Sequence, residues 1–197
     1  MIKAIVGPMF GEKSSRLIDI ANNLEKEGKK FKVFFPASCN KKEGYIYSRK
    51  DNKKIKAIKV FNIDDLFNNI TDEEVILIDE FTFLCSHKYI DLFMSFLEQM
   101  DRMGKDVILS GLQLDYLGNS FDLTREILPY CDEIVMTSAV CEICGAPATR
   151  QVRKVNGVLD VSDDSPTLLM EDNDIVYMPV CRSCFREVTG LSAIKKN

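Results

Sequence analysis

Ile2-Lys-Ala-Ile-Val-Gly-Pro-Met-Phe-Gly-Glu-Lys-Ser14 is the stretch that decides the fold of this chain. Residues 2–6 form the apolar run of a short buried strand, which Gly7-Pro8 interrupts. Apolar side chains then recur at helical spacing, at Leu17, Ile20, Ala21 and Leu24. A strand that turns through a glycine loop into a helix is a typical phosphate-binding arrangement, because backbone N–H groups and the helix N-terminus point at the anion.

The loop itself comprises Gly7, Pro8, Met9, Phe10, Gly11, Glu12, Lys13 and Ser14. A phosphate loop requires Gly, four residues, and then Gly-Lys-Ser/Thr. Lys13 and Ser14 stand at the right distance from Gly7, but Glu12 occupies the place of the second glycine, and a glycine comes one position early at Gly11. The segment is therefore open to two interpretations, an ATP-binding loop and a tight strand-to-helix turn that binds no nucleotide.

Strands and helices alternate after this loop. The first helix should end near Gly28, with strands at 31–35, 75–78, 107–109 and 133–137 and helices at 64–69 and 86–103. Residues 40–59 are rich in lysine and predict a solvated loop or a weak hairpin. The alternation predicts an α/β phosphate-loop domain whose mostly parallel sheet is flanked by helices, with ligands beyond the carboxyl ends of the strands.

Two acids, Asp79 and Glu80, follow the apolar run 76–78. An aspartate at the end of a buried strand is typical of the Mg²⁺ site of phosphate-loop enzymes, and a neighbouring glutamate can accept a proton from a hydroxyl nucleophile. Two such acids often do no more than cap the next segment. Their position after Lys13-Ser14 favours the catalytic interpretation.

Two Cys-x-x-Cys pairs stand out in the turn-rich segment that follows Ser138: Cys141 with Cys144, and Cys181 with Cys184. Four thiolates complete a closed tetrahedral Zn²⁺ site, although four independent thiols and a redox motif are alternatives. The remaining cysteines, Cys39, Cys85 and Cys131, lack such spacing and predict core or half-buried thiols. We predict two domains, residues 1–138 and 139–197.

Composition excludes several classes of protein. The 197 residues are 46% hydrophobic and 28% charged, as in ordinary globular chains. Since 26 basic and 30 acidic side chains give a net charge of −4, we expect no nucleic-acid polymer and no membrane as partner, and residues 150–154 are interpreted as basic surface. No apolar run approaches the ~18 residues of a membrane span and no signal-peptide pattern opens the chain, which predicts a cytoplasmic protein.

Over nearly its whole length the chain resembles the zinc-containing (type II) thymidine kinases of bacteria, phages, poxviruses and animals. The resemblance rests on residues 6–10, on Ile78-Asp79-Glu80 with Phe83, and on Gly111-Leu112, Asp115, Gly118 and Phe121. It is most specific in the tail, at residues 139–149 and in Tyr177, Pro179, Cys181-Arg182 and Cys184.

The resemblance implies transfer of the γ-phosphoryl group of ATP to the 5′-hydroxyl of thymidine or deoxyuridine. It implies that Lys13 contacts the phosphates, that Ser14 and Asp79 hold Mg²⁺, and that Glu80 acts as the catalytic base on the 5′-hydroxyl. It implies a structural Zn²⁺, a lasso over the base between the cysteine pairs, and a homotetramer. The residues implied around the nucleoside are Phe83, Phe121, Leu168, Leu169, Met170 and Tyr177; Arg49 is implied near phosphate.

The chain departs from the family pattern mainly around the active site. The family has Ser and Gly at the positions of Gly11 and Glu12, and Thr82 stands where the family has Gln. Leu117 and Ser120 replace an Arg and a Pro. The alternative function is therefore a catalytically degenerate relative of thymidine kinases that acts in binding or assembly.

Overall fold

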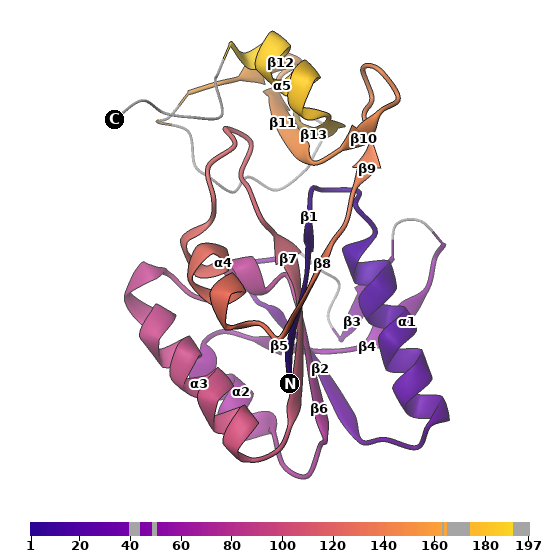
Figure 1. Cartoon of the computed structure of the whole chain (residues 1–197), viewed down its shortest axis with the longest axis vertical. Helices are drawn as coiled ribbons and strands as arrows, with labels where there is room; N and C mark the ends of the chain where they lie inside the picture. Colours follow the sequence, from indigo (N-terminus) through magenta and orange to yellow (C-terminus); the bar gives the residue numbers. More distant parts are fainter. Residues whose placement is uncertain (40–43, 49–50, 163, 165–173, 191–197) are drawn as a thin grey trace.

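The computed structural model describes residues 1–39, 44–48, 51–162, 164 and 174–190. In this part of the chain a six-stranded sheet has the order β5-β2-β6-β7-β1-β8, and all its neighbouring strands are parallel (Figure 1). The expected mostly parallel sheet is confirmed. The strands are β1 (Ile2–Gly7), β2 (Phe31–Pro36), β5 (Ile58–Val60), β6 (Val75–Asp79), β7 (Asp106–Leu112) and β8 (Glu133–Met136).

Helices cover both faces of this sheet (Figure 1). Helix α1 (Lys13–Lys26) lies on one face, and α2 (Ile63–Asn69), α3 (Ile90–Arg102) and α4 (Asp122–Ile127) lie on the other. Successive strand residues therefore enter two different cores: Ile5 packs with the residues of α1, whereas Ala4 and Val6 pack with those of α2 and α3. Burial on both faces is the reason that the strands have unbroken apolar runs instead of an alternating pattern.

For residues 40–59 the sequence predicted a solvated loop or a weak hairpin; the structure has the hairpin, but part of the segment is buried and not solvated. β3 (Tyr45–Tyr47) and β4 (Lys54–Lys56) form an antiparallel hairpin, and β5 joins the main sheet beside β2. Ile46 and Val60 are buried in the two cores. Three-residue strands are too short for a recognisable hydrophobic period.

The elements after β6 also differ from expectation at their boundaries. Two 3-10 turns, η1 (Phe81–Phe83) and η2 (His87–Tyr89), precede α3, so this helix starts later than the predicted residue 86. The six-residue α4 and the turn η3 (Leu128–Tyr130) were not predicted. None of the helices in the described ranges is both long and apolar enough to cross a bilayer.

A small second module follows β8 and stands over the carboxyl ends of the parallel strands (Figure 1). Its sheets have the orders β12-β11-β13 and β10-β9, and α5 packs on β11. The core is centred on Val152, Val180 and Phe185. The elements are β9 (Ala139–Val140), β10 (Pro147–Ala148), β11 (Arg150–Val155), β12 (Val158–Asp160), β13 (Ile175–Val180) and α5 (Arg182–Thr189).

Candidate functional site

The phosphate-loop segment lies between the end of β1 and the start of α1, and it packs tightly against Thr137, which directly follows β8. A Cβ atom on Gly7 would lie 2.1 Å from the Thr137 hydroxyl oxygen, and one on Gly11 would lie 2.7 Å from it. The early glycine at position 11 is thus explained by packing. The buried Thr137 hydroxyl itself has no hydrogen-bond partner among the described residues.

Glu12 occupies a left-handed backbone conformation, with φ of 60° and ψ of 20°. Glycine adopts this conformation without steric cost, whereas a residue with a Cβ atom pays roughly 1–2 kcal/mol. The family's glycine therefore suits the geometry at this position better than the glutamate does. The Glu12 side chain is exposed.

Lys13 is buried and folds back over the loop. Its Nζ donates a hydrogen bond of 2.7 Å to the carbonyl oxygen of Pro8. The cation thus lies inside the turn of backbone that follows β1, where an arriving phosphate would compete with the Pro8 carbonyl for it.

Ser14, Asp79 and Ser110 meet at the carboxyl edge of the sheet. The buried Asp79 carboxylate accepts a 2.9 Å hydrogen bond from the Ser14 hydroxyl through Oδ2, and another from the Ser110 hydroxyl through Oδ1. Asp79 and Ser110 are direct partners in the β6–β7 register. Hydroxyl and carboxylate oxygens are the hard donors that Mg²⁺ prefers, so this group is chemically suited to that ion.

Sequence reasoning predicted Ser14 and Asp79 as a pair but assigned no role to Ser110. Ser110 directly follows the predicted strand 107–109, and this position is the one local signal that could have pointed to it. Its contact with Asp79 follows from the sheet order, because β6 and β7 are neighbours. That order is not readable from the strand sequences.

Glu80 directly follows β6 and has a left-handed backbone with φ of 54°. Its carbonyl accepts a 3.0 Å hydrogen bond from the N–H of Phe83, which closes the turn η1. Its side chain is partly exposed next to the buried Asp79. The strand end therefore carries a buried aspartate followed in sequence by a partly exposed glutamate, and the catalytic role of Glu80 stays a prediction.

Thr82, which replaces the family's Gln, points into the protein interior. Its hydroxyl donates a 3.0 Å hydrogen bond to the Leu112 carbonyl, which also accepts one of 2.8 Å from Thr124. A Cβ atom on Gly111 would lie only 2.4 Å from the Thr82 hydroxyl oxygen. In this conformation Thr82 joins η1 to β7 and α4.

Phe83 and Phe121 form an edge-to-face pair with ring centroids 5.4 Å apart and planes at 85°. They line a cavity of about 930 Å³ together with Ser38, His87 and Asp122. The structure thus brings these two predicted nucleoside residues together. Leu168, Leu169 and Met170, and Arg49 as well, lie outside the described residues.

Tyr177, the remaining predicted nucleoside residue, lies in β13 and is buried. Its hydroxyl is 3.4 Å from Nη1 of Arg153. The fully buried Arg153 guanidinium lies 3.6 Å above the Tyr116 ring and donates hydrogen bonds of 2.7 and 3.0 Å to Asp160. The interpretation of residues 150–154 as basic surface was therefore wrong for Arg153.

Gln151 joins the second module to the loops of the first. Its side-chain oxygen accepts a 3.1 Å hydrogen bond from the N–H of Met9, and its amide nitrogen donates one of 2.6 Å to the Leu114 carbonyl. Asp115 shapes the loop after β7 by accepting hydrogen bonds from the N–H groups of Leu117 and Asn119. Sequence reasoning missed Gln151, since an isolated glutamine has no recognisable pattern.

The four cysteines of the two Cys-x-x-Cys pairs converge. The Sγ atoms of Cys141, Cys144, Cys181 and Cys184 all lie within 4.8 Å of one another. The distance between Sγ of Cys144 and Sγ of Cys181 is 3.7 Å. Tetrahedral Zn–S bonds of about 2.3 Å require sulfur atoms about 3.8 Å apart, so the donor set fits a structural zinc ion.

The electrostatic environment of this cluster favours thiolates at two of its positions. Burial opposes ionisation of Cys141, but the N–H groups of Cys181, Cys144 and Ile143 outweigh it and lower the pKa of the thiol to about 6. The N–H of Cys184 lowers the pKa of Cys181. The thiolate is the form that ligates zinc.

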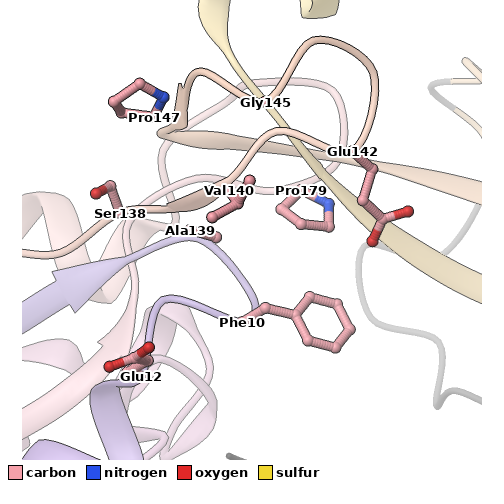
Figure 2. A pocket seen from close by; sticks show the side chains of 9 residues that line it. All are labelled: Phe10, Glu12, Ser138, Ala139, Val140, Glu142, Gly145, Pro147 and Pro179. Carbon is pink, nitrogen blue, oxygen red and sulfur yellow. The ribbon is translucent and has the colours of Figure 1, made fainter.

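A second cavity, of about 520 Å³, lies between the phosphate-loop segment and the β9–β10 hairpin (Figure 2). The ring of Phe10 and the carboxylate of Glu12 bound it from the loop side, and Glu142 bounds it from the second module. The remaining lining residues are Ser138, Ala139, Val140, Gly145, Pro147 and Pro179.

The parallel sheet, the loop between β1 and α1, and the Ser14–Asp79 pair together define a phosphate-loop α/β protein with an added four-cysteine metal-binding module. Residues 1–185 match the family model described as thymidine kinase, and the chain belongs to that family. The convergence of the four cysteines is consistent with the zinc-containing type.

Proposed function

We propose that this protein transfers the γ-phosphoryl group of ATP to the 5′-hydroxyl of thymidine or deoxyuridine. The observation that carries the proposal is the hydrogen-bonded group of Ser14, Asp79 and Ser110, with Glu80 next to Asp79 in the chain and the Phe83–Phe121 pair on the segments that follow β6 and β7. Phosphoryl transfer depends mainly on positioning and on neutralising charge, which this grouping suits.

On the donor side, Lys13 exchanges the Pro8 carbonyl for the phosphates of ATP, and the backbone N–H groups of residues 7–14 complete the cradle. Ser14 and Asp79 would hold Mg²⁺, which when bound neutralises charge on the β- and γ-phosphates. Ser110 keeps the Asp79 carboxylate oriented toward Ser14 through its own hydrogen bond.

On the acceptor side, Glu80 accepts the proton of the 5′-hydroxyl as that oxygen attacks the γ-phosphorus. Its partial exposure beside the buried Asp79 suits this role, because Asp79 stays engaged by two hydroxyls. Phe83 and Phe121 enclose the nucleoside from the first domain, residues 1–138. Tyr177 belongs to the second domain, residues 139–197, which a structural Zn²⁺ would fix through its four cysteines. The assignment of Leu168, Leu169 and Met170 to the nucleoside is carried over from the family, since these residues lie outside the described ranges.

The second candidate function is a silent relative that binds partners without catalysis. It is favoured by the hydrogen bond of Lys13 to Pro8 and by the glutamate at position 12, since both act against polyphosphate in the loop. A homotetramer belongs to the same proposal as the kinase activity, because it is taken from the family. A cytoplasmic location stays the prediction that was made from the sequence.

The test is a phosphorylation assay with γ-labelled ATP, Mg²⁺ and either thymidine or deoxyuridine. Wild-type protein should form the 5′-monophosphate, and Glu80→Gln should lower kcat by ~10²–10⁴ with little change in ATP binding. The matched control is Glu98→Gln on the exposed side of α3, which should keep the wild-type rate. Nucleoside binding without any turnover would favour the silent relative instead.

A further inference from the structure

The hydroxyl of Thr137 is a buried polar group to which the proposed reaction gives no role. Thr137 directly follows β8, its side chain is 5% exposed, and its hydroxyl has no hydrogen-bond partner among the described residues. We propose that this hydroxyl positions the phosphate loop for the donor, by taking over the Pro8 carbonyl when a phosphate draws Lys13 away from it. This inference rests on the proposed function, which it extends by naming a residue that stabilises the donor-loaded loop.

The position of Thr137 is fixed by the main sheet. Its N–H donates a 2.8 Å hydrogen bond to the Val6 carbonyl, which continues the pairing of β8 with β1 by one residue. The hydroxyl oxygen lies 2.1 Å from the place of a Cβ atom on Gly7 and 2.7 Å from that of one on Gly11. The hydroxyl therefore lies between the two glycines of the loop, in space that a larger residue at either position would fill.

The Pro8 carbonyl lies beside the second of these glycines. Its oxygen is 3.0 Å from the place of a Cβ atom on Gly11, so the Thr137 hydroxyl and this carbonyl both lie within 3.0 Å of one point. The carbonyl accepts hydrogen bonds of 2.7 Å from Lys13 Nζ and 3.2 Å from the N–H of Gly11. Because a carbonyl oxygen has two lone pairs, these two donors occupy it fully.

A bound phosphate changes which donors the carbonyl has. The N–H groups of a phosphate loop turn toward the anion, and the carbonyls turn away from it, since the two groups of a trans peptide point in opposite directions. When Lys13 moves to the phosphate, the Pro8 carbonyl loses its cationic donor and keeps the N–H of Gly11. A shift of the Pro8–Gly11 turn then brings the carbonyl to the Thr137 hydroxyl, whose proton rotates about its C–O bond.

This exchange predicts effects of opposite sign on stability and on nucleotide binding. A buried hydroxyl without a partner costs free energy that an apolar group of the same shape avoids, and valine has the shape of threonine. In the free loop Thr137→Val should therefore raise the Tm by about 2–4 °C. In the phosphate-bound loop the same change removes a hydrogen bond, so phosphate ligands should bind more weakly. A side chain that serves packing alone does not give this combination.

The first experiment is calorimetric titration with ATP·Mg²⁺ and with inorganic tripolyphosphate. We expect Thr137→Val to bind both ligands about tenfold more weakly than wild type, and Thr137→Ser, which keeps the hydroxyl, to stay within about twofold of wild type. The affinity for thymidine should be unchanged in both variants. The matched control is Thr71→Val, the same chemical change at an exposed threonine that precedes β6, which should bind both ligands as wild type does.

The second experiment measures the Tm without any ligand in two backgrounds. Lys13→Met removes the cationic donor of the Pro8 carbonyl, and the Thr137 hydroxyl should then take its place in the absence of phosphate. Thr137→Val should raise the Tm by about 2–4 °C in the wild-type background but lower it by about 2–4 °C in Lys13→Met. The titration alone decides if Lys13→Met does not fold.

Three outcomes would overturn the inference. Wild-type affinity of Thr137→Val for both phosphate ligands does so and leaves the kinase proposal standing. Equal Tm changes in the two backgrounds do so as well, because the hydroxyl then does not share the Pro8 carbonyl with Lys13. Failure of wild-type protein to bind either ligand overturns the donor role of Thr137 together with the kinase proposal.

Discussion

Replacement of Glu12 should strengthen ATP binding, because its carboxylate stands directly before the lysine that is assigned to the phosphates. Two charges about 4 Å apart repel by about 4 kcal/mol at an effective dielectric constant of 20, but by about 1 kcal/mol in a water-like medium. Glu12 is exposed, so the smaller value applies. A gain of about 1 kcal/mol corresponds to roughly fivefold tighter binding.

Two substitutions separate charge from backbone conformation. Glu12→Gln removes the charge and keeps a Cβ atom, so it should tighten ATP·Mg²⁺ about fivefold and leave the Tm unchanged. Glu12→Gly should tighten binding similarly and also remove the cost of about 1–2 kcal/mol that a residue with a Cβ atom has in the left-handed conformation. The greater entropy of glycine in the unfolded chain offsets about 0.5–1 kcal/mol of this gain in stability. We expect the Tm of Glu12→Gly to rise by about 1–4 °C.

The assay is calorimetric titration of ATP·Mg²⁺ at low and at high ionic strength. The advantage of Glu12→Gln over wild type should shrink as salt is added, since exposed charges are screened over about 10 Å at 0.1 M. Equal affinities of wild type and Glu12→Gln at low salt would refute the electrostatic reasoning. Adding Gly11→Ser to restore the family's loop would require the Thr137 side chain to shift, because the new Cβ atom would lie 2.7 Å from its hydroxyl oxygen.

Three other predictions concern the second module and one half-buried thiol. Cys181→Ser should abolish stoichiometric zinc in metal analysis and raise the KM for thymidine, since the cysteines hold the module in place; full zinc content would contradict the assigned ligand set. Arg153→Met should destabilise the protein by about 3–5 kcal/mol in urea unfolding because it removes the guanidinium that pairs with the Asp160 carboxylate, and Arg153→Lys should recover part of this loss. Burial raises the pKa of Cys85 to about 11, so at pH 8 its thiolate fraction is about a hundredfold below that of an ordinary thiol. Alkylation of Cys85 in the folded protein should therefore be about a hundredfold slower than in the unfolded protein. Equal alkylation rates in the folded and unfolded protein would contradict this prediction.

Local patterns in the sequence were sufficient for the fold class and for the metal cluster. Unbroken apolar runs such as 75–78 predicted strands buried on both faces, and the structure has them in a parallel sheet. The two Cys-x-x-Cys pairs predicted a four-thiolate cluster, and their sulfur atoms do converge. Both inferences depend on spacing within a few residues, which is information that a sequence displays directly.

The pairing of Ser14 with Asp79 was also predictable, because each belongs to a recognisable motif at a strand end. The roles of Glu80, Phe83 and Phe121 stay predictions, although the structure brings the two rings together. The short strand β5 was missed, since three residues beside a lysine-rich segment give too little periodicity.

Tertiary structure alone decided which residues complete the site. Ser110 meets Asp79 because β6 and β7 are neighbours in the sheet, and Thr137 meets Gly11 because β8 lies beside β1. Gln151 reaches Met9 across 142 positions of sequence. These contacts join segments whose proximity depends on strand order and on the docking of one module on another, and no local spacing encodes either of them.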